Sequence, residues 1–282
     1  MYAISKIGSF THSEEHLRCF IEDGVGVIDL KDNAFEIIAD LCQKDLLLQR
    51  LSLAEVRDEI RVVLLRSDPS ALGEENYNQF WKNVSLAKNS NLRSAFPYSA
   101  SLEMQVAREE NTLSQLITKV LTCGKLIIAT VNGSVVEQFL SMALAADYRI
   151  ASESTVFSFP HVKIGMPPQG AITHLLSRCI GYAETKRILL KSSPINAEMA
   201  LKMNLVDEVM PDRDFDEMSM RRAQELKELD PLQVGMIKRL LEHNEKELER
   251  CFSIESKLVV RRWLRLSADS IEAKHTSGDM EH

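Results

Sequence analysis

Apolar residues along the chain recur in patterns that predict short strands alternating with helices. Two β-rich runs, at 16–23 and 25–30, are separated by Asp23-Gly24, which is typical of a hairpin. From residue 33 the apolar positions recur at helical spacing, and this helix leads into a β-branched strand over 61–67. The pattern therefore predicts a strand–helix–strand unit near the start of the chain.

The next segment, residues 70–101, shows no sustained period. It mixes Gly, Asn, Ser and Pro with five aromatic residues: Tyr77, Phe80, Trp81, Phe96 and Tyr98. A long connection of this kind inside a compact domain is often a functional lid. A helix followed by a loop is the alternative, and the sequence leaves both open.

Regular patterns return after this segment. The predicted elements are a helix over 106–121, a buried strand over 125–131, a turn at Asn132-Gly133, a helix running into a strand over 135–152, a short strand over 154–159, further helices, a strand over 205–210, and helices from Phe215 with a break near Asp230-Pro231. Strands and helices in alternation, followed by helices alone, indicate an α/β fold with a helical C-terminal region.

Composition narrows the functions. The chain of 282 residues is 45% hydrophobic and 27% charged with a net charge of -7, as in an ordinary globular protein. This charge gives no overall attraction to nucleic acid or anionic lipid, so chemistry on a small molecule is favoured. Five scattered cysteines without a C-x-x-C pair argue against a disulfide framework or a zinc site. With no signal-peptide pattern and no apolar run of about 20 residues, we expect a cytoplasmic protein.

One long segment carries a more specific signal. Residues 125–170 contain Asn132-Gly133, the passage ALAADYRIAS at 143–152, and then Pro160, Gly165 and Pro168; ALKMNLVDEVMP follows at 200–211. In these residues and their spacing the chain resembles the crotonase (enoyl-CoA hydratase/isomerase) superfamily. Weaker similarity extends back through the strand at 61–67 to the strand at 25–30.

The resemblance implies an α/β spiral of strand–strand–helix turns at 1–211, a helical oligomerisation region at 212–268 and a flexible tail at 269–282. It implies homotrimers or dimers of trimers. It also implies an acyl-CoA thioester as ligand, with coenzyme A as part of the substrate and no separate cofactor or metal. In such proteins two backbone N–H groups bind the thioester oxygen, because an enolate-like oxyanion develops there.

The aligned positions also depart from the family. Glu137, Gln138 and Phe139 fall on three consecutive glycines, while Ser141 and His161 fall on the two catalytic glutamates. Addition of water to an enoyl thioester needs a base and an acid, so a conventional hydratase is disfavoured. Ser141 and His161 are a candidate catalytic pair; the alternative is a satisfied histidine in a closed pocket beside a small helix residue.

Three further features bear on the site, and two of them have alternative interpretations. The backbone N–H groups of Gln138 and Glu74 are the aligned oxyanion donors, although neither family motif is intact there. Glu137 could enter the pocket one helical turn before Ser141, or it could simply favour the helix start. The basic run at 257–266 could meet coenzyme A phosphates, or it could be an amphipathic packing helix.

Two functions follow as hypotheses. The first is an enzyme that performs isomerisation, decarboxylation or hydrolysis of a thioester through an enolate, with His161 as acid/base and Ser141 as its polar partner. The second is a non-catalytic homologue that serves as an assembly or regulatory subunit. Inward side chains at residues 137–139 favour the second hypothesis, and an open pocket there favours the first.

Overall fold

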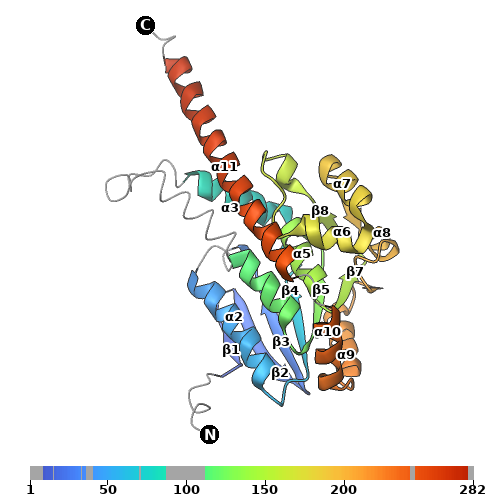
Figure 1. Ribbon diagram of the computed structural model, residues 1–282. Helices are drawn as coiled ribbons and strands as arrows, with labels where there is room; N and C mark the ends of the chain where they lie inside the picture. Colours follow the sequence, from blue (N-terminus) through green and yellow to red (C-terminus); the bar gives the residue numbers. More distant parts are fainter. Residues whose placement is uncertain are drawn as a thin grey trace.

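The computed structural model describes residues 9–14, 16–32, 34–35, 41–69, 71–86, 112–241 and 245–278 (Figure 1). The strands are β1 His12–Ser13, β2 Leu17–Glu22, β3 Val25–Leu30, β4 Val62–Ser67, β5 Leu126–Val131, β6 Ser134–Val136, β7 Tyr148–Ser152, β8 Val156–Ser158, β9 Ile195–Asn196 and β10 Glu208–Met210. The helices are α2 Leu41–Val56, α3 Glu74–Leu86, an unlabelled helix over 112–122, α5 Glu137–Ala145, the 3-10 helix η4 Pro160–Val162, α6 Ile172–Ile180, α7 Tyr182–Lys191, α8 Ala197–Lys202, α9 Phe215–Leu226, α10 Pro231–Leu241 and α11 Glu245–Gly278.

The main sheet has seven strands in the order β1-β2-β3-β4-β5-β7-β10. The hairpin end is antiparallel, and the pairs from β3 to β10 are parallel. A smaller sheet, β6-β8-β9, stands beside it. Parallel neighbours need helical crossovers, which explains the alternation in the sequence. The α/β architecture with a helical C-terminal region that the sequence predicts is confirmed.

Both faces of the main sheet are covered. Val27 of β3 and Leu64 of β4 point to the face packed by Phe215 and Met220 of α9. The opposite face belongs to a larger core, which includes residues from α2, α5, α6 and the helix over 112–122. Period-two side-chain alternation in each strand separates these two cores. The candidate site lies on the larger-core side, at the start of α5.

The segment at 70–101 begins as a helix. Tyr77 and Trp81 of α3 are buried in the larger core, where Phe35 packs edge-on against Tyr77 and Phe139. The first half therefore follows the helix interpretation, and its aromatic residues are core residues. Residues 87–101 lie outside the described residues, so a lid there stays a prediction.

A tight turn joins the sheets at Asn132-Gly133, as the sequence predicts. Gly133 has φ +71°, and a Cβ on it would lie 2.6 Å from the carbonyl oxygen of Pro69. No side chain fits this approach, because the contact is with backbone. The turn leads into the short strand β6, which the sequence patterns did not reveal, and β6 delivers the chain to Glu137.

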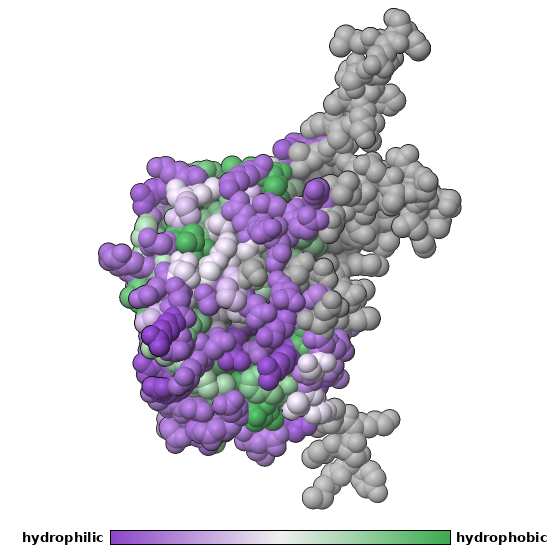
Figure 2. Space-filling view, turned by 180° about the vertical axis from the view of Figure 1, so that it is seen from behind, coloured by the Kyte–Doolittle hydropathy of each residue, from purple (hydrophilic) through white to green (hydrophobic). Residues whose placement is uncertain are grey.

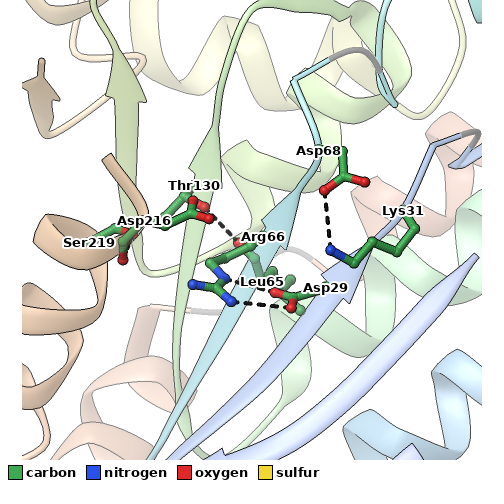
Figure 3. Close-up of polar contacts among 8 residues, drawn as sticks. All are labelled: Asp29, Lys31, Leu65, Arg66, Asp68, Thr130, Asp216 and Ser219. Carbon is green, nitrogen blue, oxygen red and sulfur yellow. Dashed lines mark hydrogen bonds and ion pairs between the residues drawn. The ribbon is translucent and has the colours of Figure 1, made fainter. Parts of the chain in front are cut away.

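Polar side chains gather near the carboxyl ends of β3, β4 and β5 (Figure 3). Arg66 donates two hydrogen bonds to the buried Asp29 carboxylate, at 2.7 and 3.1 Å, and Lys31 pairs with Asp68 at 3.3 Å. Thr130 Oγ1 donates to the Leu65 carbonyl. These residues bond one another across neighbouring strands, so we assign the cluster to holding the strand ends together.

The C-terminal helices include both core and exposed surfaces. Lys238 of α10 reaches Asp147 at 2.7 Å, which fixes α10 against β5 and β7. The predicted boundary between 268 and 269 falls within α11, which is continuous from Glu245 to Gly278. None of the described helices is both long and apolar enough to cross a membrane. The face seen in Figure 2 is mainly hydrophilic, with small separate apolar areas.

Candidate active site

The first turn of α5 carries buried polar side chains where the aligned family has glycines. Glu137 and Gln138 are each 0% exposed, and Phe139 is buried in the aromatic part of the core. All three side chains therefore point inward. Glu137 is the first residue of α5, where the helix dipole favours a negative charge.

His161 faces Glu137 from the short helix η4. Its Nδ1 lies 3.2 Å from Glu137 Oε1, and its Nε2 lies 3.2 Å from the carbonyl oxygen of Leu189. A carbonyl can only accept, so Nε2 must donate. Leu189 is in the last turn of α7, where carbonyls lack helical partners. His161 thus connects the positive start of α5 to the negative end of α7.

This geometry restricts the protons on the pair. With a proton on Nε2, Nδ1 meets the carboxyl group either as an imidazolium beside a carboxylate or as a neutral imidazole beside a carboxylic acid. Burial raises the pKa of Glu137, and the nearby His161 opposes that rise. Both arrangements keep an N–H donor on Nε2.

Ser141 lies one turn further along α5. Its hydroxyl donates to the carbonyl of Glu137 at 3.0 Å, and it makes no hydrogen bond with His161 within the described residues. The structure thus brings His161 to Glu137 rather than to Ser141. The role of each as a catalytic residue stays a prediction.

The loop that follows η4 closes against the same turn of α5. Gln138 Nε2 donates to Gln169 Oε1 at 2.9 Å, with both side chains fully buried. Gly170, at φ +75°, packs so closely that a Cβ would lie 3.3 Å from Ser141 and 3.4 Å from the Gln138 Cα. The cavity beside Gln138 has only about 10 Å³ of free volume, roughly enough for one water. The loop at 165–171 therefore packs directly against the first turns of α5.

Glu74 begins α3 close to this turn. Its backbone N–H donates to Ser134 Oγ at a long 3.4 Å, and its carboxylate pairs with Lys163 at 2.6 Å. The starts of α3 and α5 both pack against β6. Two helix N-termini with N–H groups to donate therefore lie near one strand.

On its other side, His161 opens to a groove of about 970 Å³ between α6, α7 and α11. His174 lines this groove as well, and burial together with Arg178 lowers its pKa. Two contacts hold the 165–171 loop to α11: Glu255 accepts from the N–H of Ala171 at 2.9 Å, and Arg262 donates to the Gly165 carbonyl at 2.6 Å.

Comparison with known proteins identifies the family. A family model for enoyl-CoA hydratase/isomerase matches residues 98–265, more than half of the chain. The chain belongs to the enoyl-CoA hydratase/isomerase family.

Among relatives in this family, a probable enoyl-CoA hydratase of Rhodobacter capsulatus is 35% identical over 121 residues, which are 43% of this chain and 46% of the relative. Methylmalonyl-CoA decarboxylase of Escherichia coli is 28% identical over 129 residues, 46% of this chain and 49% of the relative. The chain thus spans about half the length of these relatives.

Solved structures show that the family fold extends over most of the chain. The enoyl-CoA hydratase from Bacillus halodurans has a TM-score of 0.70 at 19% identity, covering 88% of this chain and 94% of that one. A probable enoyl-CoA hydratase from Mycobacterium thermoresistibile also has 0.70, at 18% identity, with coverage of 90% and 99%. At these identities the likeness shows the fold alone.

Family alignment found the residues in the first turn of α5 but not their partners. It missed Gln169 and the Leu189 carbonyl, because nothing in the spacing of 160–190 shows that these groups return to α5. In the basic run at 257–266, Val259 is buried in the core, and Arg262 donates to the backbone carbonyl of Gly165. Both side chains therefore pack α11 against the rest of the protein. No group of three or more His, Cys, Asp or Glu that could hold a metal ion occurs in the described part of the chain.

Proposed function

We propose that the protein binds an acyl-CoA-type thioester and that the His161–Glu137 pair delivers a proton to an enolate formed from it. The observation that carries this proposal is the buried contact of 3.2 Å between Nδ1 and Oε1, with an N–H on Nε2 that donates to the Leu189 carbonyl and must leave it to reach a ligand. Buried, perturbed ionisable pairs beside a groove are typical of functional sites. Burying such a pair contributes little to stability by itself.

Decarboxylation makes the smallest demand on this site, compared with isomerisation or hydrolysis. The bond from Cα to the carboxylate breaks, CO₂ leaves, and the electron pair passes into the thioester as an enolate. His161 Nε2–H then protonates Cα, and a solvent proton restores the pair. A relative named methylmalonyl-CoA decarboxylase supports this choice within the family.

Enolate stabilisation falls to the backbone N–H groups of Gln138 and Glu74. Both lie in the first turn of a helix, where N–H groups lack helical acceptors and the dipole favours an anion. A thioester can reach Gln138 only if the Gln138–Gln169 contact opens. We therefore propose that the 165–171 loop moves when the ligand binds.

Turnover across a panel of enoyl-, malonyl- and methylmalonyl-type thioesters tests the proposal. The wild type should convert at least one, and His161→Gln should lower kcat by about 100-fold or more, as loss of a general acid does. His12→Gln changes a histidine of β1 outside the groove and should retain activity. Equal background rates for wild type and His161→Gln across the panel would reject the proposed enzymatic function.

The non-catalytic homologue is the second candidate, and the inward side chains of Glu137, Gln138 and Phe139 favour it. In that case His161 would serve only to join α5 to α7. Calorimetry with coenzyme A and several acyl-CoAs separates the candidates. Binding heat supports a thioester site, whereas no heat at high protein concentration supports the assembly subunit.

We also propose a homotrimer or a dimer of trimers in a reducing, cytoplasmic setting. The support for assembly is the apolar surface of α10, where Leu232, Met236 and Leu240 are all more than half exposed. The four cysteines whose side chains are described are free thiols, which supports the compartment. Light scattering should give a trimer or hexamer mass, and a stable monomer would contradict the assembly.

A further inference from the structure

Helix α11 holds both ends of the loop at 165–171. Arg262 Nε donates to the Gly165 carbonyl at 2.6 Å, and the Glu255 carboxylate accepts from the Ala171 N–H at 2.9 Å. Glu255 and Arg262 are seven residues apart, which places them on one face of the helix, about 10 Å from each other along its axis. α11 also packs against α6, which begins directly after the loop (Figure 1). One helix therefore sets the positions of both loop ends.

The Gly165 end of this loop is shaped for the Arg262 contact. Gly165 has φ +69°, and a Cβ on it would lie 3.0 Å from Arg262 Nη2. Glycine both accepts this backbone conformation and leaves room for the guanidinium group. The guanidinium thus lies against the loop backbone rather than extending into solvent.

Gly165 also ends the turn that carries His161. The N–H of Gly165 donates to the Val162 carbonyl at 3.1 Å, and the N–H of Met166 donates to the His161 carbonyl at 2.9 Å. These bonds close residues 161–166 into one compact unit, so a displacement of Gly165 shifts His161 with it. A shift of about 1 Å at a catalytic group can slow a reaction about 100-fold.

The Ala171 end carries backbone strain that Glu255 offsets. Ala171 has φ +53°, directly after Gly170 at φ +75°. A residue with a Cβ keeps this left-handed conformation only where surrounding contacts impose it. Glu255 is 6% exposed and supplies such a contact. Because Gln169 comes immediately before these residues, Glu255 also fixes the backbone of the side chain that bonds Gln138.

We infer that Arg262 and Glu255 are positioning residues, which act through the loop to place His161 and the first turn of α5 relative to each other. The inference rests on the proposed function and deepens it, because it names the residues that set the position of the proton donor. The sequence pattern also allows Arg262 to meet coenzyme A phosphates, as part of the basic run at 257–266. Loss of a phosphate contact weakens binding, whereas loss of a positioning contact slows the chemical step.

Exchange of the His161 Nε2 proton with solvent, followed by NMR on ¹⁵N-labelled protein without ligand, tests the inference. Arg262→Met keeps the apolar stem and removes the donor. It should speed this exchange about tenfold or more, because a hydrogen bond from a charged group typically contributes such a factor. Arg221→Met is the matched control: it removes an exposed arginine from its pair with Glu217 on α9 and should leave the exchange unchanged. The signal is assigned by its loss in His161→Gln.

Turnover of a thioester gives a second measurement, which carries the test if Arg262→Met fails to fold. Glu255→Met should lower kcat about tenfold or more. Glu255→Gln should keep the wild-type kcat, because the amide oxygen still accepts from the Ala171 N–H. Arg262→Met should lower kcat as Glu255→Met does, and both should keep the affinity for acyl-CoA within about twofold.

Unchanged proton exchange and unchanged kcat in Arg262→Met and Glu255→Met would overturn the inference while leaving the proposed function intact. Weaker binding of acyl-CoA with an unchanged kcat in Arg262→Met would also overturn it, in favour of a phosphate contact. Faster exchange in Arg262→Met together with no turnover by the wild type would reject the proposed function, while α11 would still be the element that positions His161.

Discussion

Glu137 lies where a carboxylate is costly to bury, with no exposed surface at the first residue of α5. The contact with His161 and the positive end of α5 offset this cost directly. The negative end of α7 contributes indirectly, because the Leu189 carbonyl accepts from His161. A residue that needs so many compensating groups is sensitive to substitution. Its titration gives the most direct signature of its surroundings.

The free energy of unfolding should therefore depend on pH through the titration of the Glu137 carboxyl group. Burial raises its pKa above the ordinary 4.5, so the folded protein holds this proton more tightly than the unfolded chain. Stability from this group is present below pH 4.5 and is lost as pH rises through the raised pKa. The free energy of unfolding of the wild type relative to Glu137→Gln should fall over that window, as measured by urea unfolding at several pH values.

Glu198→Gln serves as the control for that measurement. Lys202 lowers the pKa of this exposed carboxylate, so its effect should be small and opposite in sign: stability from the wild-type group is present above pH 4.5 and is lost as pH falls through the lowered pKa. A pH-independent difference between wild type and Glu137→Gln would show that Glu137 does not titrate as the buried pair requires.

Gly170 shows how tightly the loop closes on α5. Gly170→Ala should destabilise the protein by about 2–3 kcal/mol, because it combines a positive φ with contacts at 3.3 Å to Ser141. Gly24→Ala has a similar φ of +78° and would meet only ordinary contacts at 3.6 Å and beyond, so it isolates the backbone cost of about 1–2 kcal/mol. Equal losses in thermal or urea unfolding would mean that the loop does not pack against α5 in solution.

Single residues were predictable from sequence only where a motif fixes them. The positions of Glu137, Gln138, Ser141 and His161 follow from alignment with the family. Their contacts do not, because Gln169 and the carbonyl of Leu189 reach them through a loop and a helix end whose course depends on packing. The Ser141 hydroxyl shows the limit clearly: it bonds its own helix rather than His161.

At the scale of elements, Lys238 holds α10 to the sheet through polar contacts. Lys238 Nζ reaches both Asp147 Oδ2 and the Lys125 carbonyl, and burial raises the pKa of Asp147. Lys238→Met should lower stability by about 1–3 kcal/mol, because it leaves Asp147 largely buried without its cation. Lys202→Met, in an exposed pair with Glu198, should cost less than about 0.5 kcal/mol. Equal effects in urea unfolding would show that α10 does not depend on this contact.

Elements with strong periodicity were predictable in type and place. The strands β3, β4 and β5 fall within the predicted runs. The three-residue strand β6 carries too little pattern to detect. The pattern of the segment at 70–101 did not define α3, because its buried aromatic residues follow tertiary packing rather than a regular period.

At the scale of the molecule, the fold fixes where chemistry can occur. The starts of α3 and α5 pack against β6, η4 brings His161 to Glu137, and α11 braces the loop that covers Gln138. Composition predicted small-molecule chemistry in general terms, and the family motifs narrowed this to a thioester. The closed first turn of α5 emerges only from the packing of three distant segments.

Conversion of a malonyl- or methylmalonyl-type thioester in D₂O, followed by NMR at Cα of the product, tests the central claim most directly. Because the His161–Glu137 pair is proposed to protonate the enolate left by loss of CO₂, the wild type should form a product with deuterium at Cα. His161→Gln and Glu137→Gln should slow its formation by about 100-fold or more, whereas His12→Gln, on β1 outside the groove, should not. Formation of the deuterated product at an unchanged rate in His161→Gln, or none by the wild type with any such thioester that it binds, would contradict the account.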